Sequence, residues 1–511
     1  MTKQPSTDFD AIVIGAGHNG LITAAYLARH GLSTLLIEAR SEVGGTAASD
    51  HFAGARVNIC NCDHLTFRTT AVAEELSLNK FGLSYLNVEP PQVNLDWTSQ
   101  KPWELWFDVD QTVDSIAQHF PSAAQEYHAF ARHMIPVARL ILEASAQPPS
   151  RTSLIATIAK RGGKGVSTLL KASRMSAADV MRQFFTEEAI IGPAMVEGPV
   201  VWGLSPETPG TGLAAAAFAL RHVAQVGRPV GGSGALPEAL KQSFLQSGGL
   251  LRTGTKVVGI VCEGNSVRAV QTSDGASMTA RVVVSACDPK RTFVTWLKNP
   301  PARAQELVNR WSNSETGEGY ESKIDAVTTE APSLLGNAPV PSTIVVSPSL
   351  AELHRGAQLM REGRLMPRMA YLANTPSVAD SSLVPQGQHV FSLEALFTPY
   401  SYTEGWESRV EPERWLRQFA TLTQPTFMDS IIEWRAMTPV DYETKFHLPK
   451  GHATSFAGGP LAAFLGSQPE LTRYHTPIKG LYLTGAATFP GAGVWGASGR
   501  NTALTILKEI R

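Results

Sequence analysis

Three glycines, Gly15, Gly17 and Gly20, lie where an apolar run changes into a helical pattern. Residues 11–14 read Ala-Ile-Val-Ile, which is typical of a buried parallel strand, and residues 21–30 carry apolar side chains at helical spacing. Gly15 permits a tight bend, Gly17 lets the backbone approach an anion, and Gly20 lets the helix pack closely on the strand. The amides at the start of such a helix bind phosphate. The spacing therefore predicts a dinucleotide-binding turn with contacts at Gly15, Ala16, Gly17, His18, Asn19 and Gly20.

A carboxylate follows the second predicted strand, residues 34–37, where ribose is bound in domains of this kind. Glu38 lies 18 residues after Gly20 (38 − 20 = 18). A carboxylate at this position accepts hydrogen bonds from the ribose hydroxyls of an adenosine, and it repels a 2′-phosphate. The sequence therefore favours FAD or NAD over NADP.

A second glycine pair distinguishes between these two cofactors. Gly44 and Gly45 come shortly after Glu38, where a nicotinamide domain normally continues into its next helix. Backbone without Cβ atoms can lie against the rest of a pyrophosphate and the ribityl chain of a flavin. The pair therefore favours FAD, with contacts at Glu38, Ala39, Gly44, Gly45 and Thr46, although an ordinary loop is the alternative.

A glycine-rich loop, residues 486–501, follows a short predicted strand at 480–485 and precedes a helix that continues to residue 511. Its glycines match the dinucleotide spacing formally, but five residues separate Gly485 from Gly491, so the strand does not turn directly into a helix. We expect instead that the loop brings bare backbone against an isoalloxazine ring, and that the helix directs its positive dipole end at the flavin. The predicted contacts are Gly485, Ala486, Gly493, Val494, Gly496 and Ala497.

Five segments carry a wider pattern. They are Val-Ile-Gly-Ala-Gly-His-Asn-Gly-Leu at 13–21, Gly-Gly at 44–45, Gly-Gly-Ser-Gly-Ala-Leu at 231–236, Val-Ser-Ala-Cys-Asp-Pro at 284–289 and Pro-Gly-Ala-Gly-Val-Trp-Gly-Ala-Ser-Gly-Arg-Asn at 490–501. Together they resemble the phytoene desaturase-like FAD-dependent oxidoreductases. Within that family they resemble the branch named for pyridine nucleotide-disulfide oxidoreductase domain-containing protein 2.

The resemblance implies an α/β fold, similar to amine oxidases, in which a Rossmann-type FAD-binding domain is built from discontinuous segments and an α+β substrate domain is inserted between them. The expected FAD-binding segments are 1–75, 230–300 and 456–511, and the expected substrate-domain blocks are 76–229 and 301–455. In relatives a hairpin holds the adenine, with a backbone contact at the position that Val257 occupies here. We expect this hairpin at 250–261 and 266–272, after a helix at 237–246, and further strands at 342–346 and 389–396.

Composition restricts the partners and the location. The chain has 511 residues, a formal net charge of −1 and a pI of about 6.9, which predicts no electrostatic attraction to nucleic acid. Four cysteines are too few for a disulfide framework; we expect Cys60 and Cys62 to be ordinary thiols, and we expect no metal site. Residues 1–6 lack the apolar core of a signal peptide, so we expect a cytoplasmic location.

One apolar run bears on membrane contact. Residues 212–220 could rest at a bilayer surface, which would make the protein peripheral to a membrane, or they could pack inside the substrate domain. No run is long enough to span a bilayer. A homo-oligomer is compatible with the sequence.

Candidates for catalysis are few. His64 lies soon after the first cofactor segment, where it could contact the substrate or serve as a base, or where it could be a structural hydrogen-bonding residue. Glu394 and His447 are weaker candidates because only their place in the second substrate block favours them. Trp495 stands in the C-terminal loop where relatives often have a smaller residue. Its indole would narrow the cavity and offer a flat face to a ring or a conjugated chain, unless it packs in the interior.

Three classes of function remain. We expect an FAD-dependent dehydrogenase or oxidase that introduces a double bond into an apolar, isoprenoid or alicyclic small molecule by hydride transfer to the flavin. A saturase or isomerase of a polyene or enone is one alternative, and a flavoprotein that mainly binds a partner is another. The electron acceptor could be oxygen or a quinone.

Overall fold

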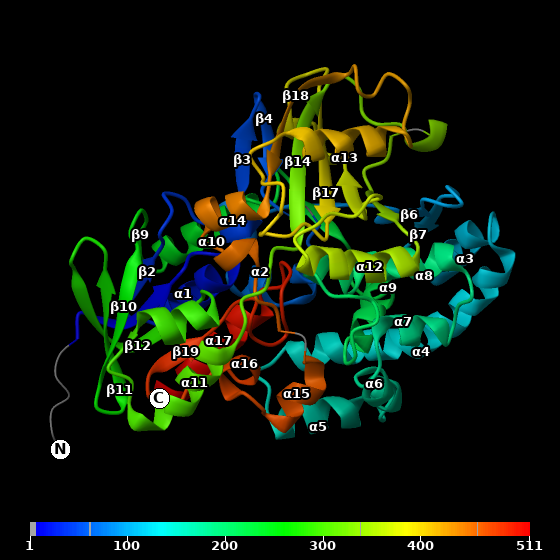
Figure 1. The fold of residues 1–511 in the computed structure, drawn as a ribbon. Coiled ribbons are helices and arrows are strands. Elements are labelled where there is room, and N and C mark those ends of the chain that lie inside the picture. Colours follow the sequence, from blue (N-terminus) through cyan, green and yellow to red (C-terminus); the bar gives the residue numbers. More distant parts are fainter. Residues whose placement is uncertain (1–6, 61–62, 338, 457, 511) are drawn as a thin grey trace.

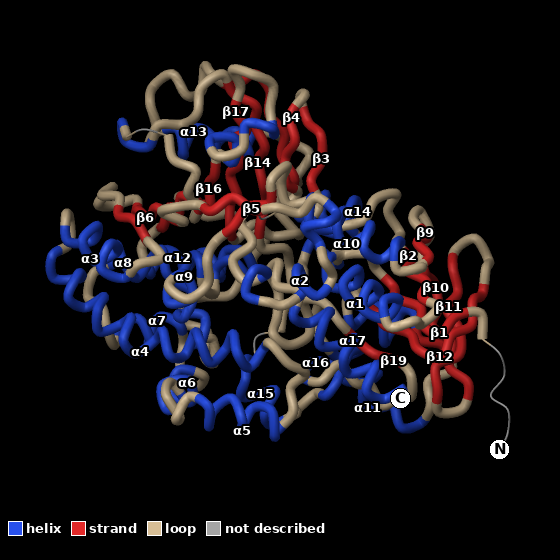
Figure 2. The backbone as a smooth tube through the Cα atoms, turned by 180° about the vertical axis from the view of Figure 1, so that it is seen from behind, coloured by secondary structure: helices blue, strands red, loops and turns tan. Residues whose placement is uncertain are grey.

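The computed structural model describes residues 7–60, 63–337, 339–456 and 458–510. Two large sheets and a group of helices form three parts of the molecule (Figure 1). The first and the last described residues lie near the first sheet (Figure 1). The second sheet stands at the top of the view in Figure 1. A helical layer that includes α4 (Pro121–Ser145), α6 (Val166–Ala172) and α7 (Ala177–Arg182) lies below it, and the reverse view in Figure 2 shows the same arrangement.

The first sheet has eight strands in the order β13-β10-β11-β12-β1-β2-β9, with β19 paired to β12. β1 is parallel to β2 and β12, whereas β10, β11 and β12 form an antiparallel meander. The strands are β1 (Phe9–Ile14), β2 (Thr34–Ile37), β9 (Leu250–Arg252), β10 (Val257–Glu263), β11 (Ser266–Thr272), β12 (Ser277–Ser285), β13 (Leu297–Lys298) and β19 (Leu481–Leu483).

Packing on both faces explains the apolar run in β1. Ala11 and Val13 belong to a core shared with α1 (His18–Arg29), α10 (Ala235–Gln246) and α17 (Ala497–Ile510). Ile12 and Ile14 belong to a second core that includes α11 (Gln305–Asn313). A strand covered on both faces is apolar at successive positions, which is the pattern of a central parallel strand.

The second sheet has seven strands in the order β18-β14-β17-β16-β15-β6-β7. They are β6 (Gln92–Asp96), β7 (Trp103–Leu105), β14 (Glu321–Thr328), β15 (Thr343–Ser347), β16 (Tyr371–Asn374), β17 (His389–Leu396) and β18 (Ile431–Met437). Two small sheets pair β3 (Ser49–Phe52) with β4 (Ala55–Asn58) and β5 (Tyr85–Asn87) with β8 (Gly227–Pro229).

The largest hydrophobic core joins the second sheet to the helices. The helices of the inserted region are α3 (Val109–Ala117), α4 (Pro121–Ser145), α5 (Arg151–Lys160), α6 (Val166–Ala172), α7 (Ala177–Arg182), α8 (Glu188–Glu197), α9 (Ala217–Arg221), α12 (Leu350–Arg361), α13 (Val410–Ala420) and α14 (Pro439–Phe446). The remaining helices are α2 (Val72–Glu75), α15 (Gly459–Leu465) and α16 (Pro469–Thr472).

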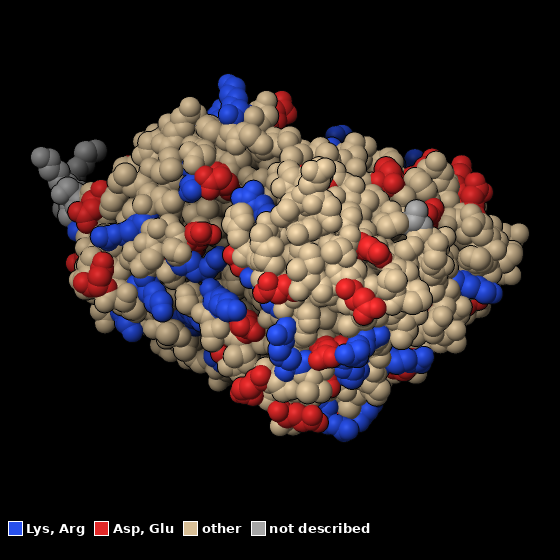
Figure 3. Space-filling view, turned by 90° about the horizontal axis from the view of Figure 1, so that it is seen from above, with Lys and Arg blue, Asp and Glu red and all other residues tan. Residues whose placement is uncertain are grey.

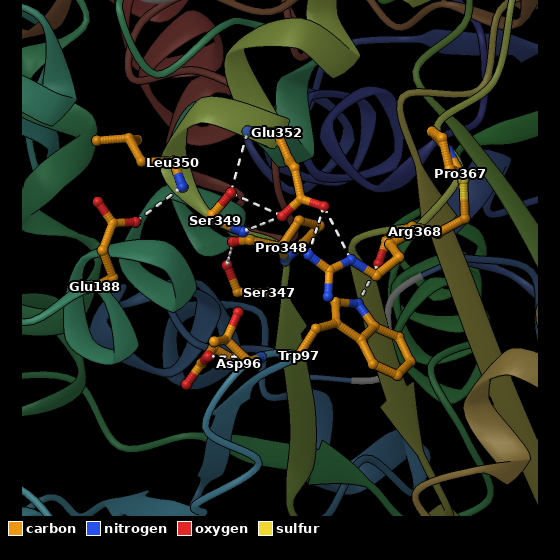
Figure 4. Close-up of polar contacts among 12 residues, drawn as sticks. Asp96, Trp97, Glu188, Ser347, Pro348, Ser349, Leu350, Glu352, Pro367 and Arg368 are labelled. Atoms are coloured by element: carbon orange, nitrogen blue, oxygen red, sulfur yellow. Dashed lines mark hydrogen bonds and ion pairs between the residues drawn. The ribbon is translucent and has the colours of Figure 1, made fainter.

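Polar contacts fix the start of α12 against the helical layer (Figure 4). Ser349 and Glu352 form a capping box, in which the Ser349 amide donates to the Glu352 carboxylate at 2.9 Å. Glu188 of α8 accepts a hydrogen bond from the Leu350 amide at 2.9 Å, and Arg368 pairs with Glu352 at 2.7 Å. These contacts satisfy amides that the helix itself leaves without partners.

The structure confirms the helix predicted at 237–246 and the strands predicted at 342–346 and 389–396, within a few residues. The predicted hairpin strand at 250–261 is wrong in part, because residues 250–252 pair in parallel with β2 and only 257–263 pair with β11. The apolar run at 212–220 lies inside the protein, where Phe218 and Ala219 are fully buried, so this run does not offer an apolar face to a membrane.

Every strand of the eight-stranded sheet falls within the predicted FAD-binding segments, and every strand of the seven-stranded sheet falls within the predicted substrate blocks. The elements that pack across this division include β4, α11 and α15. β4 packs on the second sheet through Ala55 and Val57, α11 packs on the first sheet, and α15 lies against α4 and α5. The exact domain boundaries stay a prediction.

Basic and acidic side chains are interspersed over the face shown in Figure 3, as the net charge of −1 leads one to expect. Within the described part of the chain, every helix is too short or too polar to cross a membrane.

Candidate cofactor and active site

A cleft of about 420 Å³ runs along the ends of β1 and β2 and under residues 446–454. Thirteen of the residues predicted to bind FAD line it. They are Gly15, Gly17, His18, Asn19, Gly20, Glu38, Ala39, Gly44, Gly45, Thr46, Val257, Gly485 and Ala486. The first glycine turn, the ribose carboxylate, the second glycine pair and the adenine hairpin therefore face one space, although they are distant in sequence.

Gly17 shows that the cleft suits a bound phosphate group. Its φ of −65° is one that any residue adopts, and a Cβ atom added to it would meet no protein atom within 4 Å. Among the glycines that the structure describes, Gly17 alone combines an ordinary φ with this open space. The protein itself therefore does not require a glycine here, whereas a phosphate lying against the backbone would.

The neighbouring glycines are required by the fold itself. Gly15 has a φ of +94°, which favours glycine. A Cβ atom at Gly20 would lie 1.9 Å from the carbonyl oxygen of Gly15 and 3.1 Å from the Cβ of Ala286. Because Gly20 has no Cβ atom, the start of α1 can pack close to the ends of β1 and β12, as predicted for the third glycine of the turn.

The second glycine pair is joined directly to the first turn. The Gly44 amide donates to the carbonyl of Ala16 at 2.8 Å, and Gly44 has a φ of +115°. A Cβ atom at Gly45 would lie 3.3 Å from the Cα of Gly17. Both glycine motifs thus form one continuous backbone wall, along which a pyrophosphate can lie.

Glu38 is buried at the end of β2, and its carboxylate accepts two backbone hydrogen bonds. The Ala16 amide donates to Oε2 at 2.7 Å and the Arg40 amide donates to Oε1 at 2.9 Å. A carboxylate has about four lone-pair sites, so it can still accept hydrogen bonds from ribose hydroxyls in the cleft. Glu38 therefore both fixes the first glycine turn and lies where the ribose is predicted.

The C-terminal loop adjoins this wall, but only some of its residues line the cleft. Gly493, Val494, Gly496 and Ala497 do not line the cleft, and neither does Ala16, whose amide is bound to Glu38. Loop and first turn are nevertheless close to one another, because the Gly493 backbone interacts with the His18 ring. These flavin contacts stay predictions.

Helices α1 and α17 are packed backbone to backbone behind the loop. Gly499 donates its amide to Oδ1 of Asn19 at 3.0 Å, and Thr23 donates its hydroxyl to the Gly499 carbonyl at 3.0 Å. A Cβ atom at Gly499 would lie 2.4 Å from the carbonyl oxygen of Asn19. The contact places the start of α17 next to the first glycine turn.

His64 does not line the cleft. Its side chain is fully buried, with Nδ1 at 2.9 Å from the Tyr85 hydroxyl and Nε2 at 2.8 Å from the Ser233 hydroxyl. Burial, together with the nearby His18 ring, lowers the pKa of His64 to about 3, so the ring is neutral at physiological pH. Because both ring nitrogens have protein partners, this geometry favours the structural alternative for His64, and a catalytic role stays a prediction.

Trp495 is buried to 9% exposure within the C-terminal loop, and its amide donates to the Gly493 carbonyl at 3.0 Å. It does not line the cleft. Its predicted role as a cavity wall therefore stays a prediction. Cys60, of the predicted thiol pair, donates to the Glu321 carboxylate at 3.1 Å, and Cys62 lies outside the described residues.

Several cleft residues could not be found from motifs. His447, a weak catalytic candidate, lies in the cleft wall together with Phe446 and His452, and Arg40 stacks on the Phe446 ring at 4.3 Å. Lys256 and Arg291 bring positive charge to the same space, which would favour an anionic cofactor. No local pattern marks these residues in the sequence, because they come from loops that reach the cleft only in the folded chain.

Comparison with known proteins agrees with this geometry. Residues 13–74 match an NAD(P)-binding Rossmann-like domain and residues 159–317 match the flavin-containing amine oxidoreductases. The chain is 28% identical to pyridine nucleotide-disulfide oxidoreductase domain-containing protein 2 of Mus musculus, over 99% of this chain and 94% of that protein. It is 26% identical to a limonene dehydrogenase chain of Castellaniella defragrans, over 98% and 95% of the two chains. It is 24% identical to a lycopene-forming phytoene desaturase of Paracoccus, over 98% and 97%.

The fold is also that of a solved putrescine oxidase with putrescine bound, with a TM-score of 0.65 at 14% identity over 98% of this chain and 99% of that one. The predicted α/β architecture, with a Rossmann-type domain and an amine oxidase-like fold, is therefore confirmed. The glycine wall, the Glu38 carboxylate and these similarities together indicate an FAD-dependent oxidoreductase that resembles the phytoene desaturase-like enzymes.

Proposed function

We propose that this protein dehydrogenates an isoprenoid or alicyclic small molecule and thereby introduces a carbon–carbon double bond. When FAD is bound, it supplies an acceptor for the hydride that leaves the substrate. The chain itself binds the cofactor along the Gly17 and Gly44 backbone, and holds the first turn in place through Glu38.

The observation that most supports this proposal is the combination of the open Gly17 backbone with the two relatives over nearly the full chain length. Both relatives are named for dehydrogenation or desaturation, of limonene in one case and of phytoene in the other. Limonene is alicyclic and phytoene is a linear polyene, so the shared chemistry is the removal of two hydrogens from a largely hydrocarbon skeleton. Peripheral membrane contact would suit such substrates and is part of the proposal.

Two measurements test it. Purified protein should be yellow, and denaturation should release unmodified FAD. Anaerobic mixing with limonene, geraniol and cyclic ketones should then bleach the oxidised flavin absorbance for at least one of them, with formation of a product that has one more double bond. Re-oxidation by oxygen or by a quinone would identify the electron acceptor.

Other outcomes point elsewhere. Product formation only after prior reduction of the flavin would indicate a saturase or an isomerase. No bleaching by any member of the panel would argue against dehydrogenation and favour a partner-binding role.

A further inference from the structure

One face of the seven-stranded sheet carries charged side chains that are shielded from solvent. Glu321, Lys323 and Asp325 alternate along β14, and Glu394 stands directly beside Lys323 on β17. The four residues are between 1% and 5% exposed. Charged residues are rarely buried to this degree unless they have partners, so each must be accounted for.

Three of the four have partners. Lys323 contacts Asp325 and donates to the carbonyl of Asn58 at 2.7 Å. Asp325 also accepts the Ser392 hydroxyl at 2.9 Å, and Glu321 accepts the Cys60 thiol at 3.1 Å. Glu394 is the exception, because no described residue donates a hydrogen bond to it.

The surroundings keep Glu394 protonated. Burial raises its pKa to about 8, the neighbouring Glu321 carboxylate adds to this, and Lys323 opposes it. The other charged or titratable groups near it are Asp325, Asp63, Cys60, Tyr320 and Tyr442. Near neutral pH Glu394 is therefore a neutral carboxylic acid, and its O–H group can donate a hydrogen bond.

Glu394 marks the border between the charged and the apolar part of this face. Its neighbour on one side is Lys323 and its neighbour on the other side, in register on β16, is Leu372. Directly paired residues of adjacent strands point to the same face. Leu372 lies on an interior strand of the sheet and is nevertheless only partly buried, so the face is not fully covered by protein at this point.

This border adjoins the loops predicted to hold the flavin. Asp63, which lies near enough to Glu394 to influence its charge, precedes Thr66, and the Thr66 hydroxyl donates to the carbonyl of Val494 in the C-terminal loop at 3.3 Å. On the other side, the Tyr320 ring meets the ring of the cleft residue His452 edge-on, with 5.3 Å between centroids. Segments close to Glu394 therefore reach both the C-terminal loop and the cleft.

We propose that Glu394 is a substrate-binding residue that donates a hydrogen bond to an oxygen atom of the substrate, while the apolar skeleton of the substrate lies against Leu372. The substrate class is then an oxygenated isoprenoid or alicyclic compound, such as a ketone or an enone, and not a pure hydrocarbon. This inference deepens the proposed function and rests on it. A substrate oxygen would accept a hydrogen bond from this buried O–H group.

The test compares matched ligands on the FAD-loaded protein by the change in flavin absorbance on binding. Carvone is paired with limonene, and cyclohexenone with cyclohexene, so that each pair differs by a carbonyl. The wild type should bind the ketones roughly tenfold more tightly at neutral pH, the range expected for one buried hydrogen bond. Above a pH of about 8 this preference should disappear within about one to two pH units as Glu394 ionises, since an ionised carboxylate no longer donates.

Three variants test whether Glu394 causes the ketone preference and its pH dependence. Glu394→Leu should lose the preference at every pH, and it should fold because it removes a buried polar group that has no partner. Glu394→Gln should keep a preference through its amide N–H but lose the dependence on pH. Glu321→Gln is the matched control: it should keep the preference and move the pH dependence to lower pH, since the Glu321 charge raises the pKa of Glu394.

A ligand-free measurement completes the test. Infrared difference spectra of the holoprotein should contain a protonated carboxylic acid band near neutral pH that is absent from Glu394→Gln. A missing band, equal binding or no binding of both members of every pair, or an unchanged ketone preference in Glu394→Leu would each overturn the proposal. Bleaching by hydrocarbons that is indifferent to Glu394→Leu would leave dehydrogenation in place and remove this substrate class. Ketone binding that depends on Glu394, without bleaching of the flavin, would support this substrate class and argue against dehydrogenation.

Discussion

Replacing Gly17 with alanine separates cofactor binding from folding. In the protein without ligand, the φ of −65° is allowed for alanine and no protein atom lies within 4 Å of the new methyl group. The free energy of unfolding of the apoprotein should therefore change by less than about 1 kcal/mol. If the pyrophosphate lies against this backbone, the methyl group displaces it and weakens a charge-assisted hydrogen bond. The expected loss is about 1.5–3 kcal/mol, or roughly 10- to 150-fold in the Kd for FAD.

Gly20→Ala is the matched contrast, since it adds the same methyl group three positions further on. Its Cβ would lie 1.9 Å from the Gly15 carbonyl oxygen, so α1 must move away from β1. Overpacking of this kind should destabilise even the apoprotein, by about 3 kcal/mol. Titration of apoprotein with FAD, beside thermal melts with and without the cofactor, measures both quantities. Unchanged FAD affinity in Gly17→Ala would refute the assignment of this backbone to the phosphate.

Glu38→Ala should weaken FAD binding by about 1–3 kcal/mol and also lower apoprotein stability, because the amides of Ala16 and Arg40 lose their acceptor. Unchanged FAD retention would mean that the ribose is held elsewhere. Burial lowers the pKa of His18 to about 4 and of His64 to about 3, whereas both titrate near 6.5 in the unfolded chain, so the unfolded state binds more protons below pH 6.5. Stability should therefore decrease as the pH falls from 6.5 toward 4, by about 1.4 kcal/mol per pH unit for each histidine. Urea unfolding at several pH values measures this slope, which His64→Gln should roughly halve; a flat profile would contradict the neutral, buried state of the two rings. Trp495→Ala should raise the KM for compact substrates and admit bulkier ones with unchanged FAD content, whereas a stability loss of about 3–5 kcal/mol with unchanged selectivity would show that the indole is only core.

The sequence predicted those parts of the site that depend on local chain geometry. A strand, a tight turn and a helix within a few residues determine where Gly15, Gly17 and Gly20 lie, and Glu38 follows from the length of one helix and one strand. These motifs meet in the folded cleft because parallel strands bring their carboxyl ends to one edge of a sheet.

Long-range contacts account for what the sequence did not predict. The two partners of His64 are 21 and 169 residues away, so no local pattern distinguishes its hydrogen-bonded position from a catalytic one. The same reason explains the division of residues 250–261: β9 leaves the hairpin to extend the parallel sheet beside β2, which an analysis of alternation along one segment cannot reveal. Burial of the 212–220 run likewise depends on its neighbours in the helical layer.

The surroundings of Glu394 in the fold strengthen the case for a functional role that the sequence favoured only weakly. In the sequence it is one acid in a strand that, apart from His389 at its start, has only apolar and small residues, and a single acid in such a strand is compatible with many roles. In the fold, Lys323 beside it is already engaged by Asp325 and by the Asn58 carbonyl, so the lysine does not neutralise Glu394 through a direct contact. A leucine at this position would avoid the cost of burying an acid to which no described residue donates a hydrogen bond. An acid at this position is therefore better explained by a group that arrives from outside the chain than by the stability of the sheet.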